Sequence, residues 1–430
     1  MTNQRYYVVL LMFVSVFVNY MDRVNFSVSI PSIRHQFGFD LNQIGSILFV
    51  WGIIYAAFNF PGGWLIDRLG LRWALPLTLG WWSIFTIATP FARSLSGWYV
   101  IRGLMGAGEA PIWPINAKLA NTWVSIKERS TLYTLAGSGQ YLGPFVGAFL
   151  ATWILFKFGW QWTFIDFGIL GLLILPVWIL VVRDRPALSP HVNAQEIAHI
   201  GNHAKVDEKA DWVGIRSVFF SRTGVGLLLI YLTFGYVLFT FLNWMPSYMY
   251  YTFHFSIVKA GWWSGVSYGM GFLGFVLSGP FNDYLARRFD RLTARRIGTA
   301  VPMGAGAICV VLSMAGVHAG FAGPTAVLLG LAQLFMNMTV GAWAVSVIDV
   351  SPNQASTGLV YGVYNGVLNI VGAFSSLILA AIATAHGFPA AFGSAIVFML
   401  VFIAAMLFVV DRPSYERLVA HAELSRGTAS

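Results

Sequence analysis

The chain has 430 residues, of which 57% are apolar and only 10% charged, and its net charge is +9. Ordinary soluble domains are about 45 to 50% apolar and about 25% charged, so this composition excludes a soluble protein and indicates an integral membrane protein. The basic residues gather in particular loops, which points to membrane topology rather than to a nucleic-acid partner.

Apolar runs of membrane-spanning length recur along the whole chain. A helix needs about 20 such residues to cross a bilayer, and by that measure the sequence predicts twelve spanning helices. They cover residues 6–30, 44–66, 73–91, 97–121, 130–156, 161–182, 223–252, 260–282, 295–316, 321–347, 356–385 and 388–410. The fold class predicted is therefore an all-α membrane protein.

The loops that follow the second, fourth and eighth predicted helices are rich in Arg and Lys, as is the polar stretch 183–222. Loops on the opposite side carry few basic residues. Because positively charged loops stay in the cytoplasm, we expect both termini and the 183–222 stretch to be cytoplasmic. No small-residue cleavage site follows the first apolar run, which is expected to be retained as an anchor.

The polar stretch also divides the helices six and six. We expect an N-terminal half at 1–182, a cytoplasmic central loop at 183–222, and a C-terminal half at 223–430 with a short cytoplasmic tail. The segment GGWLIDRLGLR after the second helix has a degenerate echo in SGPFNDYLARR after the eighth. Two six-helix halves related by duplication are an architecture of transporters.

The first predicted helix carries Asp22 and Arg23 side by side. A charge at membrane depth costs about 2.5 to 3.5 kcal/mol even on the lenient insertion scales, so the usual explanation is an ion or substrate pathway. Adjacent side chains on a helix point about 100° apart, and the two groups are therefore expected to serve different neighbours. A structural ion pair with another helix is the alternative.

The fourth predicted helix contains a second pair, Arg102 and Glu109, in IRGLMGAGEAP. Their spacing of seven puts them on one face, about 10 Å apart along the axis, which is too far for a simple intrahelical pair. Arginine binds a carboxylate through two parallel hydrogen bonds, so Arg23 and Arg102 are candidate anchors for an anionic substrate. The desolvated carboxylates Asp22 and Glu109 are candidate proton carriers.

These motifs give the chain a family resemblance. The six-plus-six layout, GGWLIDRLGLR and IRGLMGAGEAP resemble the major facilitator superfamily. NYMDR in the first helix and NWMPSY in the seventh are similar to its anion:cation symporter branch, which includes bacterial sugar-acid carriers and vesicular organic-anion carriers.

The resemblance implies further site residues. In that branch the positions matching Asp22 and Glu109 act in protonation, those matching Arg23 and Arg102 in substrate binding and coupling, and those matching Tyr20, Tyr55 and Gln140 contact the substrate. In the second half we expect Trp343 and Asn365 as contacts, with helix packing as the alternative. The superfamily's conformational latch corresponds to Asp67, Arg68 and Arg72.

Other residue types receive no functional role. Most Trp and Phe side chains are expected to face lipid or the membrane interface, and His191, His199 and His203 to be solvated. The sequence contains no nucleophile elbow, phosphate-binding glycine loop or Cys/His cluster, which argues against an enzyme, a metal site or a cofactor other than the coupling proton. The lone Cys309 cannot form an internal disulfide.

The sequence therefore predicts a proton-coupled importer of an organic anion, most simply a sugar acid such as a hexonate, hexarate or hexuronate. It is expected in a bacterial inner membrane, as a monomer, working by alternating access. The alternatives are a carrier of aromatic carboxylates, tartrate or phosphate, an anion exchanger or uniporter, and a sensor that does not transport.

Overall fold

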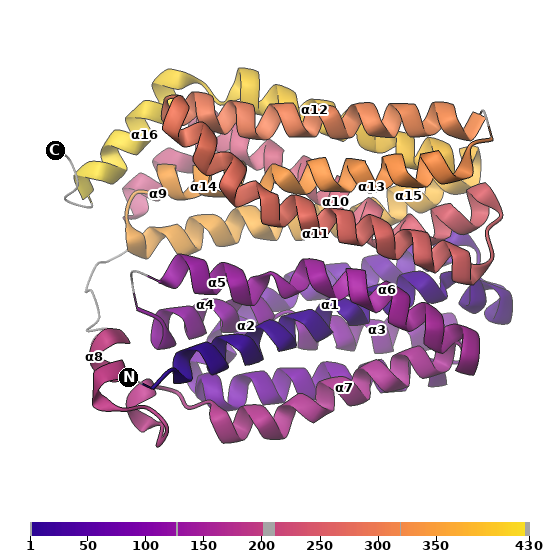
Figure 1. Cartoon of the computed structure of the whole chain (residues 1–430), viewed down its shortest axis with the longest axis horizontal. Coiled ribbons are helices and arrows are strands. Elements are labelled where there is room, and N and C mark those ends of the chain that lie inside the picture. Colours follow the sequence, from indigo (N-terminus) through magenta and orange to yellow (C-terminus); the bar gives the residue numbers. More distant parts are fainter. Residues whose placement is uncertain (1, 126–127, 201–210, 319, 426–430) are drawn as a thin grey trace. The chain divides into compact units, whose positions relative to one another are not determined.

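The computed structural model describes residues 2–125, 128–200, 211–318 and 320–425. Every regular element in these ranges is a helix (Figure 1), which confirms the predicted all-α membrane fold. Each of the twelve predicted segments lies on helix. Within the described ranges, eight stretches are long and apolar enough by themselves to cross a bilayer.

The chain divides into two compact units. One contains residues 1–206 and 256–265, and the other contains residues 207–255 and 266–430. The division at 206 falls inside the stretch 183–222, and the predicted limits of that loop remain a prediction.

The helices up to residue 206 belong to the first unit. They are α1 (Gln4–Phe37), α2 (Leu41–Ala88), η1 (Thr89–Phe91), α3 (Leu95–Glu109), α4 (Ile112–Trp123), α5 (Arg129–Gly137), α6 (Gly139–Phe158), α7 (Trp160–Val181), η2 (Pro186–Leu188) and α8 (Ala194–Ile200).

The remaining helices begin with α9 and belong to the second unit, apart from the first turns of α11. They are α9 (Trp212–Phe219), α10 (Arg222–Phe253), α11 (Ile257–Arg288), α12 (Arg291–His318), α13 (Ala322–Met338), α14 (Val340–Val350), α15 (Gln354–Ala404), the π-helical η3 (Ala405–Val409) and α16 (Arg412–Ser425).

Several helix limits differ from the predicted spans for local reasons. The second and third spans share α2, which bends sharply at Gly70, where φ is 72°. The last two spans share α15, which bends at Gly387 with a φ of 82°. Glycine adopts positive φ without the steric cost that a side chain would bring, so both bends fall on glycine. The fourth span is interrupted between Glu109 and Ile112, where α3 gives way to α4.

A row of glycines sets the distance between α1 and α6. Gly139, Gly143 and Gly147 are one turn apart and face α1, and a β-carbon on them would lie 2.7 Å from Phe17 N, 2.5 Å from Phe17 O and 3.1 Å from Met21 Cγ respectively. Small residues at this spacing allow two helix backbones to pack closely in a membrane. The glycines thereby fix the part of α1 that carries residues 17–23.

The α3 glycines do the same against α2. A β-carbon on Gly103 would meet Ile54, one on Gly106 would lie 2.6 Å from the carbonyl of Trp51, and one on Gly108 would collide with Trp81. The glycine strip between Arg102 and Glu109 therefore receives a neighbouring helix.

We expect Gly143→Ala to lower the stability of the protein by about 1 to 3 kcal/mol, because the added methyl group meets α1 backbone that cannot rotate aside. The melting temperature of the solubilised protein measures this. Gly366→Ala is the matched control: no atom lies within 4 Å of the new β-carbon, so the better helix propensity of alanine is expected to leave stability unchanged or raise it by up to about 1 kcal/mol. Equal effects at the two positions would contradict the packing role of Gly143.

Candidate functional site

Two embedded charges on different helices meet inside the first unit. Arg23 Nε on α1 lies 3.2 Å from Glu109 Oε2 on α3, and the two side chains are only 4% and 0% exposed. Glu109 thus pairs with Arg23 and not with Arg102, its neighbour on the same helix face. A buried charge is tolerated when it is paired, so the pairing lowers the cost of burying these two groups.

Aromatic rings surround the Arg23 guanidinium. Its central carbon lies 4.2 Å from the ring centroid of Tyr20, 4.7 Å from that of Trp51 and 4.8 Å from that of Tyr55. The Trp51 and Tyr55 rings are stacked, with centroids 5.5 Å apart. Arg23 Nη2 also donates to Asn19 Oδ1 at 3.4 Å. Ring faces attract cations, so the three rings stabilise the guanidinium. Its N–H groups donate to Glu109 and Asn19.

Asp22 is fully buried and has a different environment. Neither carboxylate oxygen accepts a hydrogen bond from any described residue. The Trp82 indole lies nearby without completing a bond, and Glu109, Arg102 and Arg23 are within electrostatic range. The two adjacent residues of α1 thus serve different neighbours, as helix geometry predicts.

Arg102 is also buried, with its guanidinium over the Phe26 ring at 4.6 Å and Nη1 2.9 Å from Met105 Sδ. No described carboxylate lies within ion-pair distance of it, and its Nε has no hydrogen-bond acceptor there. A buried cation whose described partners are an aromatic ring and a sulfur atom is a candidate site for an anion.

The structure brings Tyr20 and Tyr55 to Arg23, as just described. Gln140 lies in the first turn of α6 and is half-buried. It is close along the helix to Gly143, whose β-carbon position lies 3.1 Å from Tyr20 Cβ. The roles of these residues toward a substrate remain predictions.

In the second unit Trp343 is buried between aromatic rings. Its ring lies 4.5 Å from that of Tyr231 and 4.9 Å from that of Phe234, and its Nε1 donates to Thr339 Oγ1 at 3.1 Å. Asn365 is half-buried, and its backbone carbonyl accepts from Asn369 Nδ2 at 2.8 Å.

The predicted latch follows the second predicted helix. The Asp67 side chain lies outside the described part of the structure, and Arg68 is exposed. Arg72 N donates to Asp184 Oδ1 at 3.0 Å, and the same carboxylate lies directly against Gly70. The bend is thus capped by a residue from beyond α7, a contact that the sequence did not indicate.

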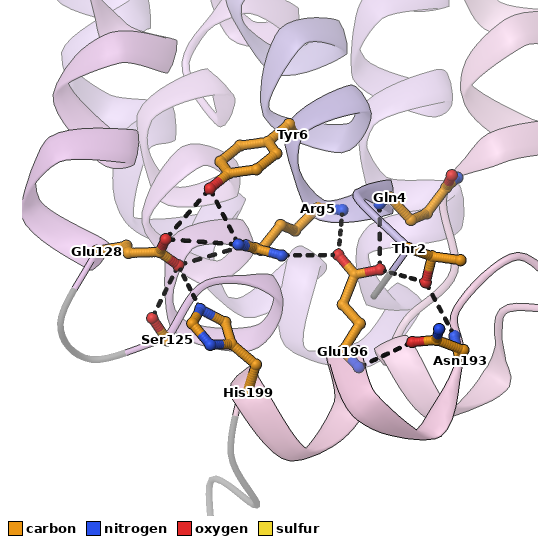
Figure 2. A network of polar contacts seen from close by, with 9 residues as sticks. All are labelled: Thr2, Gln4, Arg5, Tyr6, Ser125, Glu128, Asn193, Glu196 and His199. Atoms are coloured by element: carbon orange, nitrogen blue, oxygen red, sulfur yellow. Dashed lines mark hydrogen bonds and ion pairs between the residues drawn. The ribbon is translucent and has the colours of Figure 1, made fainter.

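A second buried charge cluster lies at the start of α1 (Figure 2). Arg5 Nη1 is 3.2 Å from Glu196 Oε1 on α8, and Arg5 Nε is 3.3 Å from Glu128 Oε2, just before α5. Glu196 also accepts from Thr2 Oγ1 at 2.6 Å and from the backbone N–H groups of Gln4 and Arg5. One arginine therefore joins three segments that are far apart in the sequence.

Glu128 contacts the remaining residues of this cluster. It accepts from Tyr6 Oη at 3.2 Å and from Ser125 Oγ at 3.0 Å, and it lies 3.0 Å from His199 Nε2. Partial burial would raise the pKa of Glu128, but His199, Ser125 and Arg5 outweigh it and lower the pKa to about 2. His199 is exposed, as expected, and its ring nitrogen also contacts the Glu128 carboxylate. His203 lies outside the described residues.

The sequence interpretation missed Trp51, Asn19 and Trp82. It assigned the aromatic residues to lipid, but these two tryptophans are buried beside the embedded charges. A signal existed: Asn19 precedes Arg23 by four residues and Trp51 precedes Tyr55 by four, the spacing at which side chains meet on a helix.

With the fold and site in view, the chain can be compared with known proteins. A model of the Major Facilitator Superfamily matches residues 12–374. The fold and the buried charges are those of a membrane transporter, and the chain belongs to the Major Facilitator Superfamily.

Several relatives are named as sugar-acid transporters. The probable galactarate/D-glucarate transporter GudP of Escherichia coli (strain K12) is 30% identical over 392 residues, covering 86% of this chain and 85% of the relative. GudP of Bacillus subtilis (strain 168) is 28% identical, covering 93% and 89%. The D-galactonate transporter of Escherichia coli O6:H1 is 26% identical, covering 94% of each.

Solved structures share the fold. A bacterial homologue of the lysosomal transporter Spinster superposes with a TM-score of 0.75 at 16% identity, covering all of this chain and 98% of that one. A D-xylose-proton symporter gives 0.72 at 16% identity, covering 94% and 97%.

We expect Glu196→Ala to destabilise the protein by about 3 kcal/mol, because Arg5 stays buried after losing one of its two carboxylates. Thermal melting of the solubilised protein measures the loss. Glu423→Ala is the control, since the pair it forms with Arg291 is nearly half exposed and such pairs contribute less than about 1 kcal/mol. A larger loss for Glu423→Ala would show that burial does not decide the strength of these pairs.

Proposed function

We propose that the protein is a proton-coupled symporter that imports an organic anion, a sugar acid such as a hexonate, hexarate or hexuronate, by alternating access. The observation that supports it most directly is the buried Arg23–Glu109 pair. A guanidinium that already holds one carboxylate can hold another of the same kind. The Glu109 carboxylate and a substrate carboxylate would therefore compete for Arg23.

Protonation is what would decide this competition. A neutral Glu109 is a weaker partner for Arg23, so the guanidinium becomes available to the substrate anion while the aromatic rings keep it in place. Loss of the proton on the cytoplasmic side would restore the pair and displace the substrate. The same residue then links proton release to substrate release.

Asp22 supplies the second carboxylate in this scheme. Being buried and without a hydrogen-bond partner among the described residues, it is costly to keep ionised. Arg102, which lacks a described carboxylate partner, would hold a second part of the anion. Tyr20, Tyr55, Gln140, Trp343 and Asn365 offer hydroxyl, amide and indole groups suited to a sugar acid.

Energetics favour proton coupling. Moving an anion inward against an inside-negative potential costs about 2.3 kcal/mol per charge per 100 mV. One co-transported proton cancels this cost for a monoanion, and a second makes uptake favourable. We place the protein in a bacterial inner membrane as a monomer with both termini in the cytoplasm, and assign Asp67, Arg68 and Arg72 the role of a cytoplasmic latch.

The names of these three relatives support the sugar-acid class, and the other anions considered from the sequence remain the second candidate. The deciding experiment is internal pH in proteoliposomes with a trapped dye, while galactonate, glucarate, glucuronate, tartrate and a neutral sugar are added outside in turn. Acidification by a sugar acid but not by the neutral sugar supports the proposal. Labelled anion exchange without any acidification would indicate an exchanger or uniporter.

Glu109→Gln is expected to abolish uptake driven by a pH gradient while sparing exchange of labelled substrate, because the amide mimics a permanently protonated side chain. Parallel uptake and exchange assays check this. Asp166→Asn is the control, as this half-buried carboxylate lies on α7 and not on the two helices that carry the pair, and it should leave both activities unchanged. Loss of both activities in Glu109→Gln would contradict a specific proton role.

Arg23→Lys is expected to weaken substrate binding by roughly tenfold although the charge is kept, because an ammonium group cannot form two parallel hydrogen bonds to one carboxylate. Competition for a bound labelled anion measures the affinity. The exposed Arg291→Lys should bind normally. Unchanged affinity in Arg23→Lys would argue against bidentate recognition.

A further inference from the structure

The short helix α9 has an unusual distribution of apolar residues. Its inner face consists of Gly214, Ile215 and Val218, which are buried. Its outer face is also largely apolar: Trp212 is 66% exposed, Val213 82%, and Phe220, directly after the helix, 80%. These positions share one face with Arg216 and Ser217, which are exposed as well.

Contacts of its inner face prevent α9 from rotating about its axis to bury the outer face. Asp211 Oδ1 accepts from Gly214 N at 2.9 Å and its other oxygen lies 3.0 Å from His421 Nε2 on α16. Asp211 N donates to Ser356 Oγ on α15 at 3.0 Å. Gly214 packs so closely that a β-carbon there would lie 2.7 Å from Pro352. The inner face is therefore bound to the second unit through both polar and apolar contacts.

The outer face continues into a membrane-spanning helix. Ser221 separates the two helices and caps α10 by accepting from Gly224 N at 2.9 Å. Spanning helix α10 begins at Arg222, and Val225 in its first turn is exposed. Because α10 is long and apolar enough to cross a membrane, α9 adjoins the point where the chain would enter the bilayer.

The residue types suit such a position. Tryptophan and other aromatic rings concentrate at membrane interfaces, where their apolar bodies enter the acyl boundary. The Arg216 guanidinium lies 5.7 Å from the Phe220 ring, so the ring and the charge form one amphipathic group. Arginine attracts the anionic headgroups of the cytoplasmic leaflet, the side on which this segment is predicted to lie.

We propose that the outer face of α9 is a lipid-binding surface. Trp212, Val213 and Phe220 insert into the boundary between headgroups and acyl chains, and Arg216 binds the phosphate of an anionic lipid. The contacts of Asp211 attach this surface to Ser356 on α15 and His421 on α16. This inference does not depend on which substrate the protein carries.

The single cysteine allows a direct test on the full chain. In a Cys309→Ala background, Val213→Cys is labelled with an environment-sensitive fluorophore and the protein is reconstituted into vesicles of phosphatidylcholine and phosphatidylglycerol in equal parts. Nitroxide-labelled phosphatidylcholine is expected to quench roughly half of the emission. Ser217→Cys, on the same face, gives a second labelled position should Val213→Cys fold poorly. Leu424→Cys near the end of α16 is the matched control, since Leu424 is 70% exposed but lies several turns beyond the spanning stretch that ends at Val409, and it should resist quenching.

Two results would overturn the proposal. Quenching by aqueous iodide and not by the nitroxide lipid would place α9 in water. Blue-shifted emission that neither quencher reaches would show that protein covers this face. Arg216→Gln in the same vesicles is expected to lower lipid quenching about twofold only when phosphatidylglycerol is present, and equal quenching with and without the anionic lipid would refute the role of the guanidinium.

Discussion

The cost of placing a charge in a medium without water governs the first unit. Arg23 and Glu109 lie on different helices, and each is buried to a depth at which an isolated charge would be expensive. Their pairing therefore constrains how α1 and α3 can be arranged. In the proposed mechanism the same pair would respond to protons, because neutralising one partner changes the energy of the other.

Glycine supplies the geometry that this contact requires. Gly143 and its neighbours on α6 bring the α1 backbone close, and Gly106 on α3 brings in the backbone of Trp51. Larger residues would push these helices apart from the separation at which Arg23 and Glu109 meet. Because these glycines have no side chain, the helices pack closely enough for Arg23 and Glu109 to meet.

The sequence predicted much of this arrangement but not its partners. Composition and apolar length placed the twelve segments, and the expense of embedded charge singled out Asp22, Arg23, Arg102 and Glu109. The pairing of Arg23 with Glu109 could not be foreseen, since the two residues are 86 positions apart in the sequence and meet only through packing between helices. Trp51 was passed over because an aromatic residue in an apolar run is usually lipid-facing. The binding of Asp184 at Gly70 likewise depends on tertiary folding.

The long helix α1 is held at two distant places. At its start Arg5 is fixed by two carboxylates, and further along its backbone lies against the glycines of α6. With 34 residues, α1 is about 50 Å long. A helix that is bound at its start and packed along one side cannot slide or tilt independently of the helices that contact it. The exchange of partners proposed for Arg23 must therefore be confined to side-chain rotation or carried by the first unit as one body.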